Sequence, residues 1–266
     1  MNQYLPTSNW VDRVSKWPFP LGTLFFLISS KIARDVFKKL MIEKSTDTAL
    51  HPIYAYSVDN DKYSIWDHRW QSSKAAQSLR FRFEWVKNTL VEIVSERVNK
   101  NLKTQLISLG SGTGLAYFNL LKTINNNIEI TMLDADERAL NRAKNMFSTL
   151  ISLPVVNYIN SISTDFLKNT SISYDLIESI GIAEYVSDEW LKNEFKFINQ
   201  RLTDDGHFIG AAISSSDEYN FAHKVLHWPN MQYRSKEAIK NLLENSGFKT
   251  IILEECGIFV AWIASR

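Results

Sequence analysis

The sequence has little of several features that mark whole classes of protein. Its 266 residues include one cysteine, Cys256, so no internal disulfide can form, and no Cys/His spacing suggests structural zinc. Thirty Lys and Arg residues oppose 29 Asp and Glu residues, and the formal net charge of +1 lacks the basic excess that nucleic acids attract. Nine glycines and six prolines are too few for a collagenous or low-complexity chain. These absences predict a soluble, cytoplasmic protein without a metal site or a nucleic-acid partner.

Long hydrophobic runs are also missing. Residues 21–28 (LGTLFFLI) fall far short of the ~20 apolar residues that a membrane-spanning helix needs, and they lack the flanks of a secretory signal. Apolar residues recur at helical spacing as far as residue 40, so we expect one amphipathic helix over 21–40. Its apolar face packs against the body of the protein or, alternatively, makes peripheral contact with a membrane surface.

Aromatic residues, in contrast, are abundant. They make up 12% of the chain, and five of the eight tryptophans precede residue 100, namely Trp10, Trp17, Trp66, Trp70 and Trp85. Residues 72–98 carry apolar side chains along one helical face and charged ones along the other, which predicts an amphipathic helix. We expect this helix to cover one side of a sheet that begins just after it.

The pattern changes at Thr104 to short apolar runs that alternate with helical segments, as in βαβ units with a parallel sheet. The expected strands are 104–109, 128–133, 155–159, 174–180, 207–213, 248–253 and 258–264. The expected helices are 114–124, 137–150, 188–201 and 235–246. Because four residues separate the last two strands, too few for a crossover helix, they should form an antiparallel hairpin at the end of the sheet.

A glycine-rich loop follows the first expected strand and reads Gly110-Ser111-Gly112-Thr113-Gly114. Glycines at such a place permit a tight turn and let a ligand approach the backbone at the start of a helix. A dinucleotide fingerprint needs its third glycine at position 115, where this chain has Leu115. The loop instead resembles the first motif, G-x-G-x-G, of the class I S-adenosylmethionine-dependent methyltransferases. That resemblance implies a Rossmann-like α/β fold and S-adenosyl-L-methionine as the cofactor.

An acidic residue, Asp134, ends the second expected strand about twenty residues beyond the loop, where it can accept hydrogen bonds from two ribose hydroxyls. In the resembled family this position holds the cofactor ribose, and the neighbouring Ala135 maps to the adenine wall. Capping of the next helix is the alternative role, and Asp136 suits it better. The resemblance also places Asp165 at the adenine amino group and Phe166 beside the ring. An ordinary exposed loop carboxylate is the alternative for Asp165.

The end of the fourth strand supplies the remaining motif. Ligands of open α/β sheets bind at the carboxyl ends of strands where the strand order reverses, and the first and fourth strands flank that point here. The resemblance then puts Ser179, Ile180 and Gly181 along the methionine moiety. It directs Glu184 and Tyr185 toward the transferred methyl group. The segment SIGIAEYV is similar to the SIGxxEH motif of cyclopropane fatty acid synthases, with Tyr185 in place of His, which suggests an acyl or small lipophilic substrate.

A hydroxyl acceptor needs a general base to take up its proton. Candidates are Glu184, His223 and His227, with Tyr185 as a hydrogen-bonding partner, although a histidine in a polar loop can equally be an ordinary surface residue. An apolar acceptor site could be walled by aromatic side chains, for which we select Trp66, Trp70, Trp228 and Tyr233. Packing in the core or in a lid is the alternative for each. A substrate carboxylate could be anchored by Arg69, Arg80 or Arg82.

We therefore predict a seven-stranded, mostly parallel Rossmann-like domain over 101–266 and a helical, aromatic-rich cap over 1–100 that serves as lid or substrate-binding part. The expected activity is S-adenosylmethionine-dependent O- or N-methylation of a small, lipophilic or aromatic molecule by direct in-line transfer. Another transfer from the same cofactor, such as cyclopropanation or aminocarboxypropyl transfer, remains an alternative, as does a non-catalytic cofactor-binding scaffold. The oligomeric state stays open.

Overall fold

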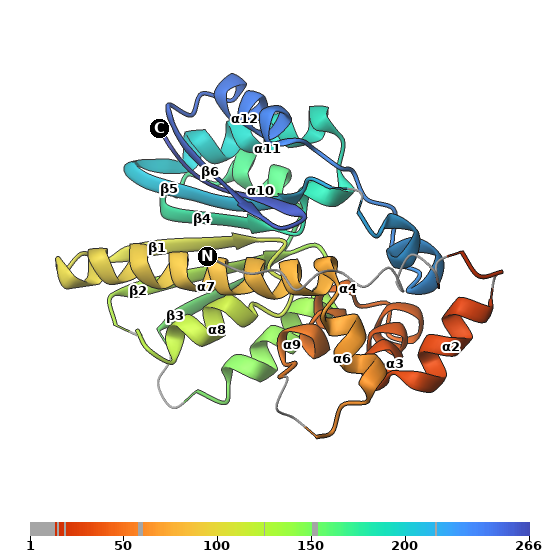
Figure 1. Ribbon diagram of the computed structural model, residues 1–266. Coiled ribbons are helices and arrows are strands. Elements are labelled where there is room, and N and C mark those ends of the chain that lie inside the picture. Colours follow the sequence, from red (N-terminus) through yellow and green to blue (C-terminus); the bar gives the residue numbers. More distant parts are fainter. Residues whose placement is uncertain are drawn as a thin grey trace. The chain divides into compact units, whose positions relative to one another are not determined.

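The computed structural model describes residues 14, 16–18, 20–57, 61–124, 126–150, 154–215 and 217–266 (Figure 1). The chain divides into two compact units. Unit 1 comprises Met1–Phe81 and Ser215–Met231, and unit 2 comprises Arg82–Ser214 and Gln232–Arg266. The boundary expected at residue 100 therefore moves into helix α7 (Lys74–Asn99), and a segment from the C-terminal half joins unit 1. Trp10 lies outside the described residues.

Unit 2 contains a seven-stranded sheet in the order β3-β2-β1-β4-β5-β7-β6. The strands are β1 (Thr104–Leu109), β2 (Ile128–Asp134), β3 (Val155–Asn160), β4 (Tyr174–Ile180), β5 (Leu202–Ile213), β6 (Thr250–Cys256) and β7 (Phe259–Ser265). Neighbours from β3 to β5 are parallel, whereas β7 is antiparallel to both β5 and β6. The predicted Rossmann-like sheet with a C-terminal hairpin is confirmed, with β5 starting five residues earlier than expected.

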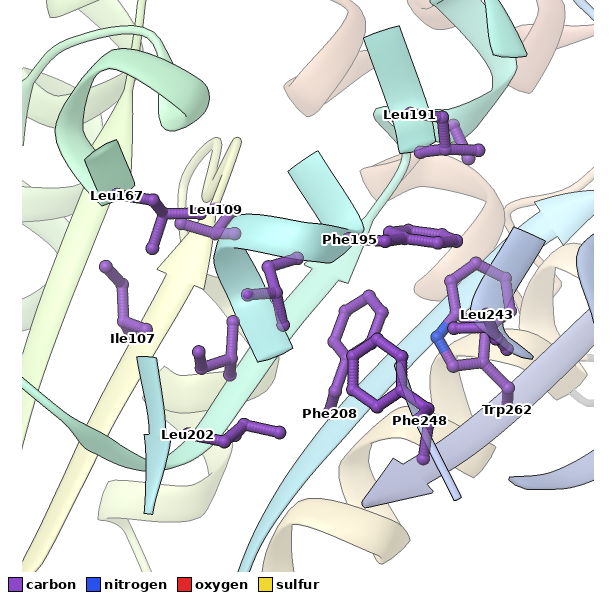
Figure 2. Close-up of a cluster of buried hydrophobic side chains, with 14 of the residues drawn as sticks. Ile107, Leu109, Leu167, Leu191, Phe195, Leu202, Phe208, Leu243, Phe248 and Trp262 are labelled. Carbon is purple, nitrogen blue, oxygen red and sulfur yellow. The ribbon is translucent and has the colours of Figure 1, made fainter. Parts of the chain in front are cut away.

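Helices cover both faces of this sheet because its strands alternate apolar side chains between two clusters (Figure 1). The unit 2 part of α7, α8 (Leu115–Leu121) and α9 (Glu137–Phe147) pack with Leu106 of β1. On the other face, α10 (Ser163–Asn169), α11 (Asp188–Arg201) and α12 (Lys236–Asn245) pack with Ile107 and Leu109. In Figure 2 the rings of this second cluster gather around Phe208, whose centroid lies 5.2 Å from Phe195 and 5.7 Å from Trp262.

In unit 1 the prediction of a single helix over residues 21–40 is wrong. The chain breaks at Ser30 into α2 (Leu21–Ser29) and α3 (Lys31–Phe37), and a π-helical turn, η1 (Lys38–Ile42), follows. Ser30 is extended, and its hydroxyl accepts the Ala33 N–H and donates to the buried Asp67 carboxylate at 2.6 Å. Burial raises the pKa of Asp67, but the hydrogen bonds from Ser30, Ile32 and Ser64 outweigh it and hold that pKa below its usual value. The break is thus fixed by a buried polar cap.

The core of unit 1 combines helices of the N-terminal part of the chain with the returning segment Ser215–Met231. Its other elements are α4 (Thr46–Ala49), α5 (His51–Tyr54), α6 (Ile65–Gln71) and the π-helical turn η3 (Phe221–Val225). Phe26 of α2, Val36 of α3 and Trp70 of α6 lie in one buried cluster with Phe221 and Val225, so the returning segment supplies part of this core. In the described part of the chain, no helix is both long and apolar enough to cross a membrane.

Candidate functional site

The glycine loop has the backbone that only glycine adopts readily. Gly110, Gly112 and Gly114 all have positive φ, between 54° and 67°. A Cβ on Gly110 would stand 2.7 Å from the side chain of Ile182, and one on Gly114 would stand 2.1 Å from Cε of Met132. The loop after β1 is therefore pressed against both β2 and the segment that follows β4.

Asp134 connects this loop to the end of β2. One carboxylate oxygen accepts the Gly112 N–H at 2.8 Å, and the other accepts the Asp136 N–H at 2.8 Å. Asp136 in turn caps α9 by accepting the Arg138 N–H, which confirms its predicted capping role. Ala135, between the two acids, is exposed. Asp134 thus orients the loop while its half-buried carboxylate stays at the carboxyl edge of the sheet.

The expected adenine-side residues lie on a helix rather than a loop. Asp165 is exposed on α10, where its backbone carbonyl accepts a hydrogen bond from Asn169, and Phe166 packs partly buried against the core cluster of α10–α12. Because β3 ends beside β2, with Asp134 in register with Asn160, α10 starts three residues beyond the edge that carries Asp134.

The end of β4 lies beside the glycine loop. Ser179 pairs with Leu109 in the sheet register and is buried. Gly181 has φ +89°, and a Cβ built there would meet nothing within 4 Å, so the backbone borders open space. Ile182 closes over Gly110, and the short 3₁₀ helix η2 (Ala183–Tyr185) follows.

Glu184 of η2 forms a buried ion pair with Arg82 of α7. The Arg82 Nη1–Glu184 Oε1 distance is 3.0 Å, and the two side chains are 6% and 4% exposed. Burial raises the pKa of Glu184 although Arg82 lowers it, and Oε2 of the carboxylate has no hydrogen-bond partner among the described residues. The neighbouring Tyr185 is exposed. Arg82 therefore holds one oxygen of this buried acid, and the other is buried without a partner in the described part of the chain.

Arg234 fixes the backbone of the same turn. Its guanidinium donates to the carbonyls of Ala183 and Val186, and Nε contacts the Asp188 carboxylate at 2.7 Å. The Gln232 N–H also donates to the Glu184 carbonyl at 2.7 Å. The segment before α12 thus positions η2 at the end of β4.

A second buried acid, Glu178, lies within β4 and was not singled out from the sequence. It is in register with Ser108 of β1, and the Ser108 hydroxyl donates a hydrogen bond to its carboxylate. Burial raises the pKa of Glu178 to about 7. The sequence does carry a signal for it, because a charged residue stands within the otherwise apolar strand end LIESI.

The two histidine candidates belong to unit 1. His227 has φ +57°, with Nε2 3.3 Å from the Thr23 hydroxyl and its ring edge-on to Phe37. His223 donates from Nδ1 to the Trp228 carbonyl at 2.8 Å. Both histidines border a cavity of about 610 Å³ within unit 1. Its lining also includes Val14, Lys16, Trp17, Pro20, Gly22, Thr23, Asn220, Lys224 and Val225.

The aromatic candidates have varied surroundings. Trp70 is 2% exposed within the unit 1 core, so it packs there and does not border this cavity. Trp66 stands edge-on to Phe25 at 4.7 Å, and Trp228 packs partly buried against the same core. Tyr233 is half-buried in unit 2. Trp17, which was not selected as a substrate residue, lines the cavity instead.

The arginines expected to anchor a carboxylate have partners within the protein. Arg82 pairs with Glu184 and lies over the Phe259 ring at 4.3 Å. Arg80 donates to the Gln71 side chain and to its carbonyl. Arg69 lies over the Trp66 ring at 4.7 Å. These contacts favour structural roles for all three side chains.

The edge formed by β1, β2 and β4 fits S-adenosyl-L-methionine. The Ser111 hydroxyl is buried in the glycine loop without a hydrogen-bond partner in the described part of the chain, and the backbone at Gly181 borders open space. Asp134 presents a carboxylate to the same edge. A polar ligand with hydroxyl and charged groups would satisfy such a surface, at the point where the strand order reverses.

This fold and this edge define a class I S-adenosylmethionine-dependent methyltransferase. Residues 79–253 match the model of a methyltransferase domain, and the chain belongs to that family. No curated protein matches the sequence.

Several solved structures share the fold at low sequence identity. A possible exported protein from Bordetella parapertussis has a TM-score of 0.69 and 13% identity, over 88% of this chain and 94% of that one. Magnesium protoporphyrin IX methyltransferase from Synechocystis PCC 6803 with bound S-adenosylhomocysteine has a TM-score of 0.59 and 11% identity, over 89% and 100%. A putative O-methyltransferase from Nostoc punctiforme PCC 73102 has a TM-score of 0.54 and 15% identity, over 92% and 72%.

Proposed function

We propose that this methyltransferase transfers a methyl group to an oxygen or nitrogen atom of a small, lipophilic or aromatic molecule. The observation that carries the proposal is the carboxyl edge of β1, β2 and β4, where a tight glycine loop, Asp134 and the open space at Gly181 adjoin a buried acid, Glu184. One structural relative is named for its action on magnesium protoporphyrin IX, which supports a small-molecule acceptor.

The cofactor-binding residues are proposed along this edge. Asp134 binds the ribose hydroxyls, and the glycine loop with its Ser111 hydroxyl lies against the middle of the cofactor. Ala135, Asp165 and Phe166 face the adenine, whereas Ser179, Ile180 and Gly181 line the methionine part. When bound, S-adenosyl-L-methionine supplies an electrophilic methyl group on a sulfonium that is already a good leaving group.

Glu184 is proposed as the general base for a hydroxyl acceptor. Arg82 holds Oε1, so Oε2 can take the proton that the acceptor loses. Burial raises the pKa of Glu184, which strengthens the carboxylate as a base, while the neighbouring Arg82 favours its ionised form. The exposed Tyr185 orients the acceptor through its hydroxyl. His227 remains a second candidate base.

A role in binding the acceptor is proposed for unit 1. A cavity of about 610 Å³ lies within the size range of small-molecule sites, and it combines the Trp17 ring with the imidazoles of His223 and His227. Lys16 and Lys224 border the same cavity and favour an acceptor that carries a carboxylate. Trp66, Trp228 and Tyr233 stay candidates for apolar contacts with the acceptor.

The function is tested by calorimetry and by product analysis. Purified protein should bind S-adenosylhomocysteine, and incubation with methyl-labelled cofactor and a metabolite extract should label a small lipophilic product. Methylthioadenosine as the co-product would instead indicate aminocarboxypropyl transfer, and a cyclopropane product would indicate a synthase. Binding of S-adenosylhomocysteine without any labelled product would favour the non-catalytic cofactor-binding scaffold, and failure to bind either the cofactor or S-adenosylhomocysteine would contradict the proposed cofactor site.

A cytoplasmic location and peripheral membrane contact through unit 1 are also proposed. Leu21, Leu24 and Ile28 recur at helical spacing on α2 and are exposed, Ile28 by 79%, and the exposed cations Lys31 and Arg34 follow. Sedimentation with anionic phospholipid vesicles tests the contact. Ile28→Glu should release the protein from the vesicles, and equal sedimentation of both proteins would contradict it.

A further inference from the structure

Glu178 occupies a particular place in the cofactor edge. It is in register with Ser108 in the β1–β4 pair. Ser108 of β1 lies two residues before Gly110, and Glu178 of β4 lies two residues before Ile180. Its carboxylate accepts hydrogen bonds from the Ser108 hydroxyl and from the Ile180 N–H, and the side chain is buried. A buried acid is thus held where the loop after β1 meets the end of β4.

The charges around Glu178 leave its carboxylate without an ion pair among the described residues. Arg82, the cation that faces it from α7, donates its 3.0 Å hydrogen bond to Glu184 instead. The group that faces it from α8 is the buried Tyr117, whose pKa is raised by burial and by the Glu178 charge. Glu184 lies in the field of both Arg82 and Arg234, whereas Arg82 is the cation that acts on Glu178. A cationic ligand beside Glu178 would therefore offset the cost of burying its charge.

We infer that Glu178 binds the α-ammonium group of the methionine part of S-adenosyl-L-methionine. This inference rests on the proposed cofactor site, in which Asp134 on β2 takes the ribose and the methionine part lies along β4. An ammonium group has N–H groups that can donate hydrogen bonds to a carboxylate, whereas the sulfonium has no such donor. Glu178 is therefore assigned to the amino-acid end of the cofactor and Asp134 to its nucleoside end.

The test compares two ligands that differ in the amino-acid part. S-Adenosylhomocysteine carries the ammonium group and methylthioadenosine lacks it, while both carry the nucleoside. In calorimetric titrations at pH 7.5, Glu178→Gln should weaken S-adenosylhomocysteine binding about tenfold or more and change methylthioadenosine binding by less than about twofold. Equal weakening of both ligands, or of neither, would overturn the inference.

Glu194→Gln is a matched control. Glu194 is fully buried on α11, its carboxylate accepts the Ser163 hydroxyl at 2.5 Å, and burial raises its pKa to about 7, as for Glu178. This control should leave unchanged the ratio of the affinity for S-adenosylhomocysteine to the affinity for methylthioadenosine. A fall in that ratio as large as the fall in Glu178→Gln would contradict a specific role for Glu178. If the unchanged protein binds neither ligand, the proposed function itself fails.

The pH dependence supplies an independent measurement. Because the pKa of Glu178 is about 7, wild-type affinity for S-adenosylhomocysteine should rise between pH 6 and pH 8, whereas affinity for methylthioadenosine should stay level. If Glu178→Gln fails to fold, the same pH dependence measured in Ser108→Ala tests the inference instead. Loss of the hydroxyl that lowers the pKa of Glu178 should move the midpoint of this rise to higher pH. An unmoved midpoint would overturn the inference.

Discussion

Replacing Arg82 by Met should destabilise unit 2 by several kcal/mol. The Arg82–Glu184 distance is 3.0 Å, and both side chains are almost fully buried. Two unit charges at that separation attract by roughly 5 kcal/mol at an effective dielectric constant of about 20. Removing one partner of a buried pair commonly costs about 3–5 kcal/mol, because the other charge stays buried without compensation. We expect a loss of that size in the free energy of unfolding at pH 8.

The loss should shrink as the pH falls. Burial raises the pKa of Glu184 and Arg82 lowers it, so removing Arg82 raises that pKa further. An acid whose pKa is higher in the folded than in the unfolded state favours folding at low pH, where it is protonated, and this contribution is lost as the pH rises through the folded-state pKa. The deficit of Arg82→Met is therefore largest at high pH and smaller toward the ordinary glutamate pKa of 4.5.

Urea denaturation at pH 5.5 and pH 8, followed by circular dichroism, measures both effects. Lys87→Met is a matched control, because Lys87 lies on the same helix and pairs with Glu84 in an exposed ion pair. The free energy of unfolding of Lys87→Met should fall by no more than about 1 kcal/mol at either pH. Equal losses in the two variants, or a deficit of Arg82→Met that is the same at both pH values, would refute the reasoning.

Three further substitutions test the cofactor edge. Gly114→Ala should cost more than about 1 kcal/mol in the free energy of unfolding, because its Cβ would stand 2.1 Å from Met132 Cε at φ +67°, and an unchanged thermal midpoint would contradict this. Asp134→Ala should weaken S-adenosylhomocysteine binding about tenfold or more, whereas Asp136→Ala should change it less than about twofold, and equal effects in calorimetry would argue against the ribose contact. Glu184→Gln should lower kcat for a hydroxyl acceptor by about a hundredfold or more at unchanged S-adenosylhomocysteine affinity, and a nearly normal rate would exclude it as the base.

The sheet of unit 2 could be predicted because its signals are local. Each strand is a short apolar run, and turn residues such as Gly110 and Gly181 follow the strands at the cofactor edge. The hairpin followed from the short connection alone. The capping role of Asp136 likewise depends only on the helix that it precedes.

Features that depend on distant residues could not be predicted in this way. The apolar period of 21–40 continues through Ser30, and the break there is stabilised by Asp67, 37 residues away. The partners Arg82 and Glu184 are 102 residues apart, and neither neighbourhood indicates the other. Glu178 did have a local signal, since a carboxylate in a buried strand needs a partner, but its partner Ser108 lies on another strand.

The two-part composition of unit 1 constrains how this protein can be rebuilt. Because Ser215–Met231 joins Met1–Phe81, removing the N-terminal segment alone would leave Phe221 and Val225 without the apolar side chains that bury them. A chimera that exchanges unit 1 between relatives must therefore transplant both segments together. The same constraint applies to evolution. A substitution in one of the two segments of the unit 1 core should be compensated by a substitution in the other, although more than a hundred residues separate them in the sequence.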